Sequence, residues 1–118
     1  ANSVVVDPQE EWIGAGFADG SVRLWKMSNS NTDQILKSHT KAITDLEFSP
    51  DGKWLATAST DGTIHLWERG ENGFGTTPLL IYSGHISGIN SISFSPDGNQ
   101  IVSASDDYSL RIWDVPQD

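Results

Sequence analysis

The chain has 118 residues, no cysteine, and sixteen acidic against seven basic side chains, which give a formal net charge of −9. Without cysteine it can hold no disulfide, thiolate metal site or cysteine nucleophile, and its acidity argues against nucleic acid or an anionic membrane, because both are bound through clustered Lys and Arg side chains. Its apolar runs are far shorter than the ~20 residues of a membrane-spanning helix and no signal segment opens the sequence, so we expect a cytoplasmic protein.

The first third of the chain, residues 1–38, is predicted to consist of short strands. Apolar and β-branched runs lie on both sides of the pair Asp19-Gly20, and the second run ends at Trp25. An Asp-Gly pair between such runs indicates a hairpin with a type I′ turn, which requires positive φ at both central residues. No part of the chain has the periodicity expected of a helix.

The middle third, residues 39–83, shows the strand pattern most clearly. Four apolar or β-branched runs predict strands at residues 42–48, 54–59, 63–68 and 79–83. Asp-Gly pairs separate the first three runs, and a longer loop at residues 69–76 precedes the last. In the first run, Ile43, Leu46 and Phe48 are spaced three and then two residues apart. A β-bulge near Thr44-Asp45 is therefore expected, because it would put all three side chains on one face.

The last third, residues 84–118, repeats the middle one. A shift of 46 residues superposes these two thirds, and a shift of 42 places the first third on the middle one. The spacing of Ile89, Ile92 and Phe94 again predicts a bulge, near Asn90-Ser91. A four-stranded sheet that is apolar on both faces must stack on copies of itself, and radial stacking makes a β-propeller.

The repeated motifs resemble the signature of the WD-repeat (WD40) β-propeller family. That signature consists of a Gly-His pair, a Phe-Ser-Pro-Asp-Gly turn, a Ser-x-Asp turn and a terminal Trp-Asp. In this chain the corresponding residues are Ser38-His39 and Gly84-His85, Phe48–Gly52 and Phe94–Gly98, Ser59–Asp61 and Ser105–Asp107, and Trp67-Glu68 and Trp113-Asp114. The first unit departs from the pattern, since it lacks the Ser-Pro-Asp-Gly turn and its own His.

The resemblance implies an all-β fold built from propeller blades, each with four antiparallel strands named a to d from the inside outward. The three blades would span residues 1–38, 39–83 and 84–118, and the third would lack its outer strand d. About two and three-quarter blades cannot close a ring, which needs about 4 to 8. We therefore expect the C-terminal part of a longer propeller. The alternative is a short chain that obtains its remaining blades by self-association.

Two sets of His, Asp and hydroxyl side chains admit a catalytic or a structural interpretation. Nucleophilic catalysis uses a hydroxyl, a base and an orienting carboxylate. In WD-repeat proteins the same residue types, together with Trp, resemble a buried hydrogen-bonded tetrad. We favour the tetrad because it occurs twice in one short chain, with Thr57 and Ser103 as the preferred hydroxyls. The candidates are His39, Thr57 or Ser59, Asp61 and Trp67 in the second unit, and His85, Ser103 or Ser105, Asp107 and Trp113 in the third.

The first unit carries Ala15 and Phe17 at the hydroxyl positions, so its tetrad is expected to be broken.

His65 stands two residues before Trp67, where the other units carry Arg. Because it shares this position with Arg, we expect a half-exposed position on a solvated strand face. No second His lies nearby in sequence, so a metal site is not expected here. A Gly-Phe-Gly sequence at residues 73–75 has no following helix and predicts no phosphate site. We expect no cofactor and no metal.

The resemblance implies a rigid platform that binds a protein or peptide on one end of the propeller, its top face. The candidate residues of that face are Asn2, Ala18, Ala42, Thr44, Thr60, Gly88, Asn90 and Asp106. The negative net charge favours a basic partner. Phe74, in the loop at residues 69–76, is a further contact candidate, although it could equally fold back over the blade edge. The alternatives to a binding platform are a propeller-based enzyme with a Ser/His/Asp site and a purely structural subunit.

Overall fold

The structure is a computed structural model, and every regular element that it describes is a β-strand. It describes residues 3–8, 12–26, 29–37, 39–70, 73–74, 80–83 and 88–116, and of residues 3, 29–33, 37, 70, 73 and 74 it describes the backbone alone. Within these ranges no helix is long and apolar enough to cross a membrane. The prediction of an all-β fold is confirmed.

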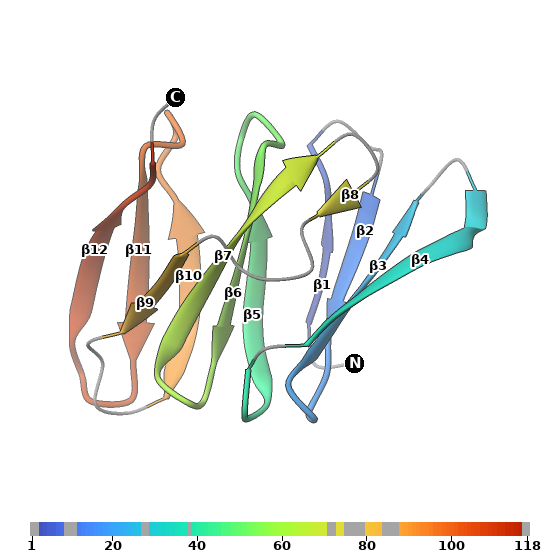
Figure 1. The fold of residues 1–118 in the computed structure, drawn as a ribbon. Coiled ribbons are helices and arrows are strands. Elements are labelled where there is room, and N and C mark those ends of the chain that lie inside the picture. Colours follow the sequence, from blue (N-terminus) through green and yellow to red (C-terminus); the bar gives the residue numbers. More distant parts are fainter. Residues whose placement is uncertain are drawn as a thin grey trace.

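The strands form three antiparallel sheets that lie side by side (Figure 1). The first sheet has the order β1 (Ser3–Val6), β2 (Trp12–Gly16), β3 (Ser21–Lys26) and β4 (Asn29–Lys37). The second has the order β5 (Ile43–Phe48), β6 (Trp54–Ser59) and β7 (Thr63–Gly70), and β7 pairs further with both β8 (Gly73–Phe74) and β9 (Leu80–Ser83). The third consists of β10 (Ile89–Phe94), β11 (Gln100–Ser105) and β12 (Leu110–Asp114). The described strands thus form open propeller blades and no closed ring, as predicted.

Part of the predicted loop at residues 69–76 is a small hairpin. Strand β7 continues to Gly70, and its Arg69 and Gly70 pair with Phe74 and Gly73 of β8 (Gly73–Phe74). Among the described residues, β9 pairs with residues 63–66 of β7, and β8 pairs with the far end of the same strand. Sequence patterning did not anticipate the pairing with β8.

Both predicted β-bulges are confirmed. The pairing register shifts between Ile43 and Asp45 in β5 and between Ile89 and Ser91 in β10. The shift in β5 brings Ile43, Leu46 and Phe48 to one buried face, as their spacing required. A bulge inserts one extra residue into one strand, so it realigns side chains that simple alternation would send to opposite faces.

The Asp-Gly turns differ from the prediction. The N–H of Gly20 donates to the carbonyl of Phe17 at 3.1 Å, and that of Gly62 to the carbonyl of Ser59 at 3.2 Å. These two glycines have φ of 89° and 86°, whereas Tyr108 is the only non-glycine with positive φ among the residues the structure describes. The type I′ prediction is therefore wrong. A type I turn followed by one left-handed residue closes each hairpin instead, and only that last residue needs positive φ.

Two apolar cores lie between the three sheets. The first is built mainly from Val22, Leu24, Leu36, Ile43, Leu46, Leu55 and Trp67. The second is built mainly from Trp54, Ile64, Leu66, Ile89, Ile92, Ile101 and Val115. Every residue of β6 is buried, because both faces of the second sheet are covered. The first and third sheets carry exposed apolar side chains at Val4, Val6, Ile35, Val102, Leu110 and Ile112.

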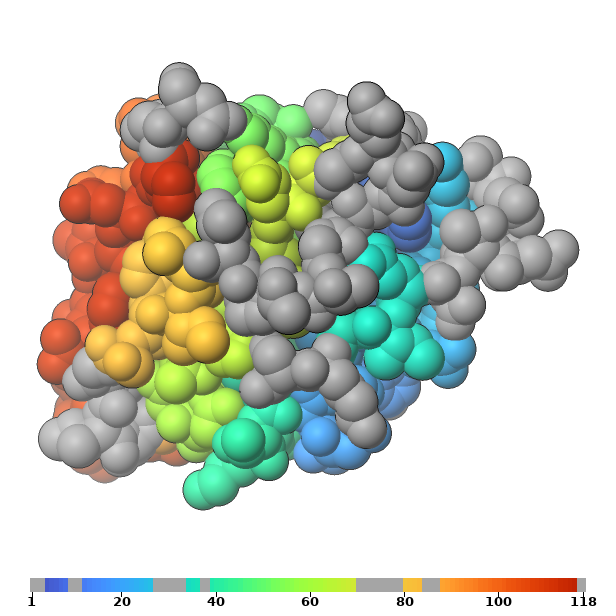
Figure 2. Space-filling view, viewed as in Figure 1, coloured from blue at the N-terminus to red at the C-terminus, as the bar shows by residue number. Residues whose placement is uncertain are grey.

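Hydrogen bonds tie the second sheet to the third on both the inner and the outer side. Asp45, in the bulge of β5, accepts a bond from the backbone N–H of Ile92 at 2.9 Å. On the outer side, the Tyr82 hydroxyl donates to the Asp114 carbonyl at 2.6 Å. In the space-filling view, the residues of β9 lie against those of the third sheet (Figure 2). Polar contacts therefore hold the second and third sheets together, in addition to their shared apolar core.

A buried ion pair ties the first sheet to the second. Arg69 Nη1 donates to Asp7 Oδ2 at 3.0 Å and to the Gly52 carbonyl at 3.2 Å, and the Asp7 side chain is fully buried. Asp7 lies in the turn where the first unit departs from the Ser-Pro-Asp-Gly motif. The substitution thus places a carboxylate opposite Arg69, whose planar guanidinium suits such a pair.

Gly16 permits close packing of the first sheet against the second. A Cβ atom at this position would lie 2.3 Å from Cγ2 and 2.8 Å from Cβ of Ile43, which is fully buried. We expect Gly16→Ala to lower the free energy of unfolding by about 1–3 kcal/mol, because a packed core resists added volume. Urea denaturation followed by Trp fluorescence measures this change. Ala18→Ser, on the exposed turn, should change it by less than about 0.5 kcal/mol; equal stability losses would contradict the packing argument.

Candidate partner-binding face and the buried histidine network

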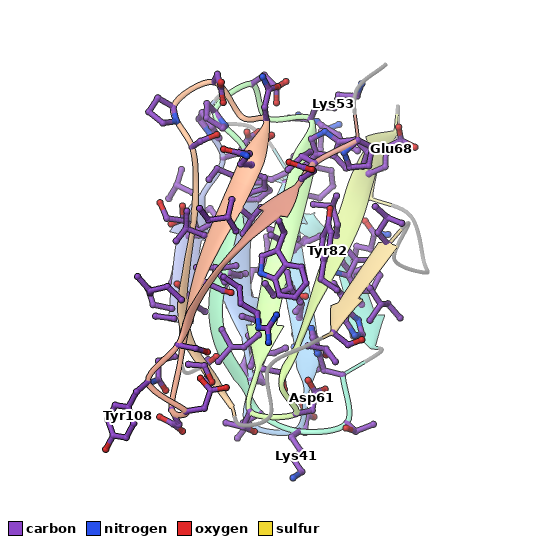
Figure 3. All side chains as sticks on the ribbon, turned by 90° about the vertical axis from the view of Figure 1, so that its left-hand side faces the viewer. Lys41, Lys53, Asp61, Glu68, Tyr82 and Tyr108 are labelled. Atoms are coloured by element: carbon purple, nitrogen blue, oxygen red, sulfur yellow. The ribbon has the colours of Figure 1, made fainter. Side chains whose placement is uncertain are left out.

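The top face is the end of the molecule that carries the β2–β3, β6–β7 and β11–β12 turns. The top face is drawn at the bottom of Figure 3, which places Lys41, Asp61 and Tyr108 at this end. Lys53 and Glu68 lie at the opposite end. In the second and third sheets, the turn is bonded to the segment that enters the same sheet. The N–H of residue 60 donates to the carbonyl of residue 42 at 3.1 Å, and the N–H of residue 106 to that of residue 88 at 3.0 Å.

Neighbouring blades also touch at the top face. A Cβ atom at Gly88 would lie 3.0 Å from Cα of Thr60, in the turn of the preceding sheet. At Gly20 a Cβ atom would lie 2.5 Å from the carbonyl oxygen of His39, and the positive φ of Gly20 independently favours glycine there. Glycine therefore lets the turns and the entering segments form one continuous surface.

The predicted top-face residues fall into two groups. The exposed ones are Ala18, Thr60, Asn90 and Asp106. Ala42 and Gly88 are half-buried beside them. Thr44 is also half-buried, and its hydroxyl donates to the backbone carbonyl of Ile89 in the next sheet, so it joins two blades. Asn2 lies outside the described residues.

A hydrogen-bonded chain of four side chains runs through the second sheet. Trp67 Nε1 donates to Thr57 Oγ1 at 3.1 Å. The same oxygen lies 2.8 Å from His39 Nε2, and His39 Nδ1 lies 3.1 Å from Asp61 Oδ2. A single arrangement of protons satisfies every pair, with the hydroxyl donating to Nε2 and Nδ1–H donating to the carboxylate. The structure thus brings together His39, Thr57, Asp61 and Trp67.

The second pair of candidate hydroxyls has a different position. Ser59 Oγ donates to the Lys41 carbonyl at 3.1 Å and accepts the Asp61 N–H at 3.1 Å. Ser105 Oγ likewise donates to the Gly88 carbonyl, at 3.0 Å. These two hydroxyls connect each turn to the segment entering the sheet, and Trp67 bonds to Thr57 instead.

The third sheet repeats the arrangement as far as it is described. Trp113 Nε1 donates to Ser103 Oγ at 2.9 Å. Asp107 Oδ1 accepts the backbone N–H of Ser109 at 2.9 Å, as Asp61 Oδ1 does for Thr63. His85 lies outside the described residues. Phe74 belongs to β8, and its side chain is likewise outside the described part.

Burial and hydrogen bonding set the charges of this network. Burial lowers the pKa of His39, although Asp61 beside it favours the protonated ring. Burial also disfavours ionisation of Asp61, but hydrogen bonds from Thr63 and the neighbouring His39 still hold its pKa below the usual value. At neutral pH the network therefore consists of a neutral imidazole that donates to a carboxylate.

His65 lies inside this network, contrary to the prediction of a solvated position. Its side chain is 4% exposed, and its ring stacks on that of His39 with centroids 3.6 Å apart and an interplanar angle of 24°. Burial, together with the neighbouring His39, lowers its pKa to about 4. Residues 65 and 67 share a face of β7, so the burial of Trp67 against the first sheet was the signal that His65 is buried too.

The hydroxyl of the buried network is inaccessible to a substrate. A nucleophilic hydroxyl must reach its substrate, but Thr57 is fully buried and already engages both Trp67 and His39. Across the described ranges, no group of three or more His, Asp or Glu side chains is placed to hold a metal ion. Satisfied polar groups in a packed interior typically specify a fold.

The sequence profile described as "WD domain, G-beta repeat" matches residues 1–26, 30–68 and 76–114. The chain belongs to the WD-repeat family. The three matches correspond to three successive WD repeats, in agreement with the repeated motifs and the three sheets. WD repeats generally mediate protein–protein interactions, and they typically act as scaffolds without enzymatic activity.

Two relatives match parts of the chain. Over 38 residues, 32% of this chain and 8% of the relative, it is 42% identical to Autophagy-related protein 16 of Arabidopsis thaliana. Over 50 residues, 42% of this chain and 12% of the relative, it is 33% identical to Lissencephaly-1 homolog of Monosiga brevicollis. The chain thus spans a small fraction of the length of either relative.

Proposed function

We propose that these WD repeats form part of a propeller that binds a partner protein or peptide at its top face. The observation that carries the proposal is the division of polar side chains between interior and surface. His39 bonds to Thr57 in the interior and to the half-buried Asp61, whereas Thr60 and Asp106 are exposed on a continuous face. A rigid scaffold with exposed turns is suited to recognition, because its loops can vary without disturbing the core.

The partner is a basic protein segment. The chain has a net charge of −9, and Asp106 is exposed at the top face. Complementary charges speed encounter and suppress wrong partners, so an acidic platform selects a partner rich in Lys or Arg.

The buried network has a structural role in this proposal. Its Thr57 oxygen is inaccessible, so the resemblance to a catalytic triad supports no reaction. Exposed apolar residues on the outer sides of the first and third sheets indicate that further blades pack there. Those blades come from the same polypeptide or from a second copy of it.

The proposal is tested with Ala42→Arg and Ala18→Arg, which add bulk and positive charge to the top face. Both should weaken binding of a basic peptide by about tenfold or more, because like charges oppose association and the added side chain obstructs contact. Fluorescence anisotropy with a fluorescein-labelled peptide of four Arg-Gly repeats measures the affinity. The melting temperature of each variant shows whether the fold is intact.

A matched control places the same charge at the other end of the blade. Asn99→Arg lies in the β10–β11 turn, opposite the top face, and should change the affinity much less than Ala18→Arg. If all three variants bind the peptide equally well, the top face is not the binding surface.

A further inference from the structure

Tyr108 combines a strained backbone with a fully exposed aromatic ring. Its φ is 66°, in the left-handed region that bulky side chains rarely adopt. Its relative exposure is 101%, so the ring packs against no described residue. Figure 3 shows it projecting into solvent from the top face. An exposed ring gains no burial energy that could offset the backbone strain.

In the other two blades, glycine occupies the corresponding position of the turn. The Tyr108 N–H donates to the Ser105 carbonyl at 3.1 Å, as the Gly62 N–H donates to the Ser59 carbonyl at 3.2 Å. Gly62 adopts the same backbone region, with φ of 86°, without steric cost. Tyr108 therefore occupies a position where glycine would make the turn more stable.

Two aspartates precede Tyr108 in the same turn. Asp106 is exposed two residues earlier, and Asp107 lies between them in the same turn. Asp107 Oδ1 accepts the backbone N–H of Ser109 at 2.9 Å, so its orientation is set by the turn. A π-face beside negative charge is a favourable environment for a cation, since ring quadrupole and carboxylate both attract it.

We propose that Tyr108 is an aromatic anchor that receives an Arg or Lys side chain of the partner over its ring, with Asp106 pairing to the same cation. This inference rests on the proposed binding of a basic partner at the top face and adds the residue that recognises its charge. The turn then keeps a strained conformation because it holds the ring where a partner can reach it.

Tyr108→Gly and Tyr108→Phe separate recognition from stability. Tyr108→Gly should weaken binding of the labelled Arg-Gly peptide by about 3- to 30-fold, the range expected for loss of a cation–π contact. The same change should raise the melting temperature by about 2–8 °C, because it relieves the left-handed strain. Tyr108→Phe keeps the ring and should retain both the affinity and the melting temperature.

Charge is tested with a pair of neutralising substitutions. Asp106→Asn should weaken peptide binding, whereas Glu68→Gln, which removes one exposed charge at the opposite end, should change it much less (Figure 3). A peptide in which citrulline replaces arginine keeps the shape but lacks the cation. It should bind wild-type protein weakly and show no difference between wild type and Tyr108→Gly.

Each result decides a specific point. Unchanged affinity in Tyr108→Gly, with weakened binding in Ala18→Arg and Ala42→Arg, would overturn the role of Tyr108 and leave the top-face proposal standing. Gly20, at the equivalent position of the first turn, lies against the next sheet, since a Cβ there would be 2.5 Å from the His39 carbonyl oxygen. A lower melting temperature in Tyr108→Gly would therefore show that the ring packs within the protein, for example on a further blade beside the third sheet, which also overturns the proposal. Failure of wild-type protein to bind the arginine peptide in preference to the citrulline peptide would overturn the basic partner itself.

Discussion

Replacing His39 by alanine is expected to lower the free energy of unfolding by about 2–4 kcal/mol. The change removes the acceptor of the Thr57 hydroxyl, at 2.8 Å, and the donor to Asp61, at 3.1 Å. It also removes the ring that stacks on His65. Buried polar groups that lose their partners cost about 1–3 kcal/mol, and the lost side-chain volume adds to that. Urea unfolding followed by Trp fluorescence measures the difference.

Thr40→Ala is the matched control for this substitution. Thr40 is the next residue and is exposed, so its side chain should contribute less than about 0.5 kcal/mol. Peptide binding by the folded His39→Ala protein should remain close to that of wild type, because His39 is buried below the top face. A stability loss no larger than that of Thr40→Ala would mean that the network contributes little to the fold.

Lowering the pH from 8 to 5 is expected to destabilise the protein through its two stacked histidines. The pKa of His65 is about 4 in the folded protein, below the ordinary value of 6.5, and that of His39 is also lowered. The unfolded chain therefore binds more protons than the folded one between pH 6.5 and 4. The stabilisation is fully present above pH 6.5 and is lost as the pH falls through this window. His65 alone accounts for about 1–2 kcal/mol at pH 5.

Comparison with His65→Phe isolates this effect. The phenyl ring can occupy the buried site without titrating, so the pH dependence between 6.5 and 4 should be reduced in the variant. Other groups act differently: Asp61, whose pKa is lowered, loses its contribution only below about its ordinary value of 3.8. Glu47, whose pKa is raised by burial and by Asp45, opposes the histidine effect near pH 5 equally in both proteins. Parallel stability curves for wild type and His65→Phe would contradict the assignment.

Local signals predicted the strands, because their information lies within a few residues. The runs at 42–48, 54–59 and 79–83 begin or end within one residue of β5, β6 and β9. The three-then-two spacing of apolar residues located both bulges. The preference for Thr57 over Ser59 as the partner of Trp67 also agrees with the observed bond. Here periodicity alone carries the necessary geometry.

Other features escaped prediction because they depend on contacts between blades. The prediction of a solvated position for His65 was wrong because the first sheet covers this face of β7. The ion pair of Arg69 with Asp7 joins residues 62 positions apart, and no local pattern points to it. The small hairpin of β8 pairs with the end of β7 beyond the residues that β9 pairs with, and no local pattern indicated it.

The sequence by itself determined the number of repeats, the strand pattern and the family, since each is written in residue spacings that recur along the chain. Only the tertiary structure decided that His65, expected in a solvated position, is buried with the predicted network, and which turn residues are exposed at the top face. Burial depends on the neighbouring sheet that covers a face, so His39 and His65 stack inside while Tyr108, in a turn of the same design as that of Gly62, stands fully exposed. The positive φ of Tyr108 depends on the hydrogen bonds that close its turn, and no local sequence pattern indicated it.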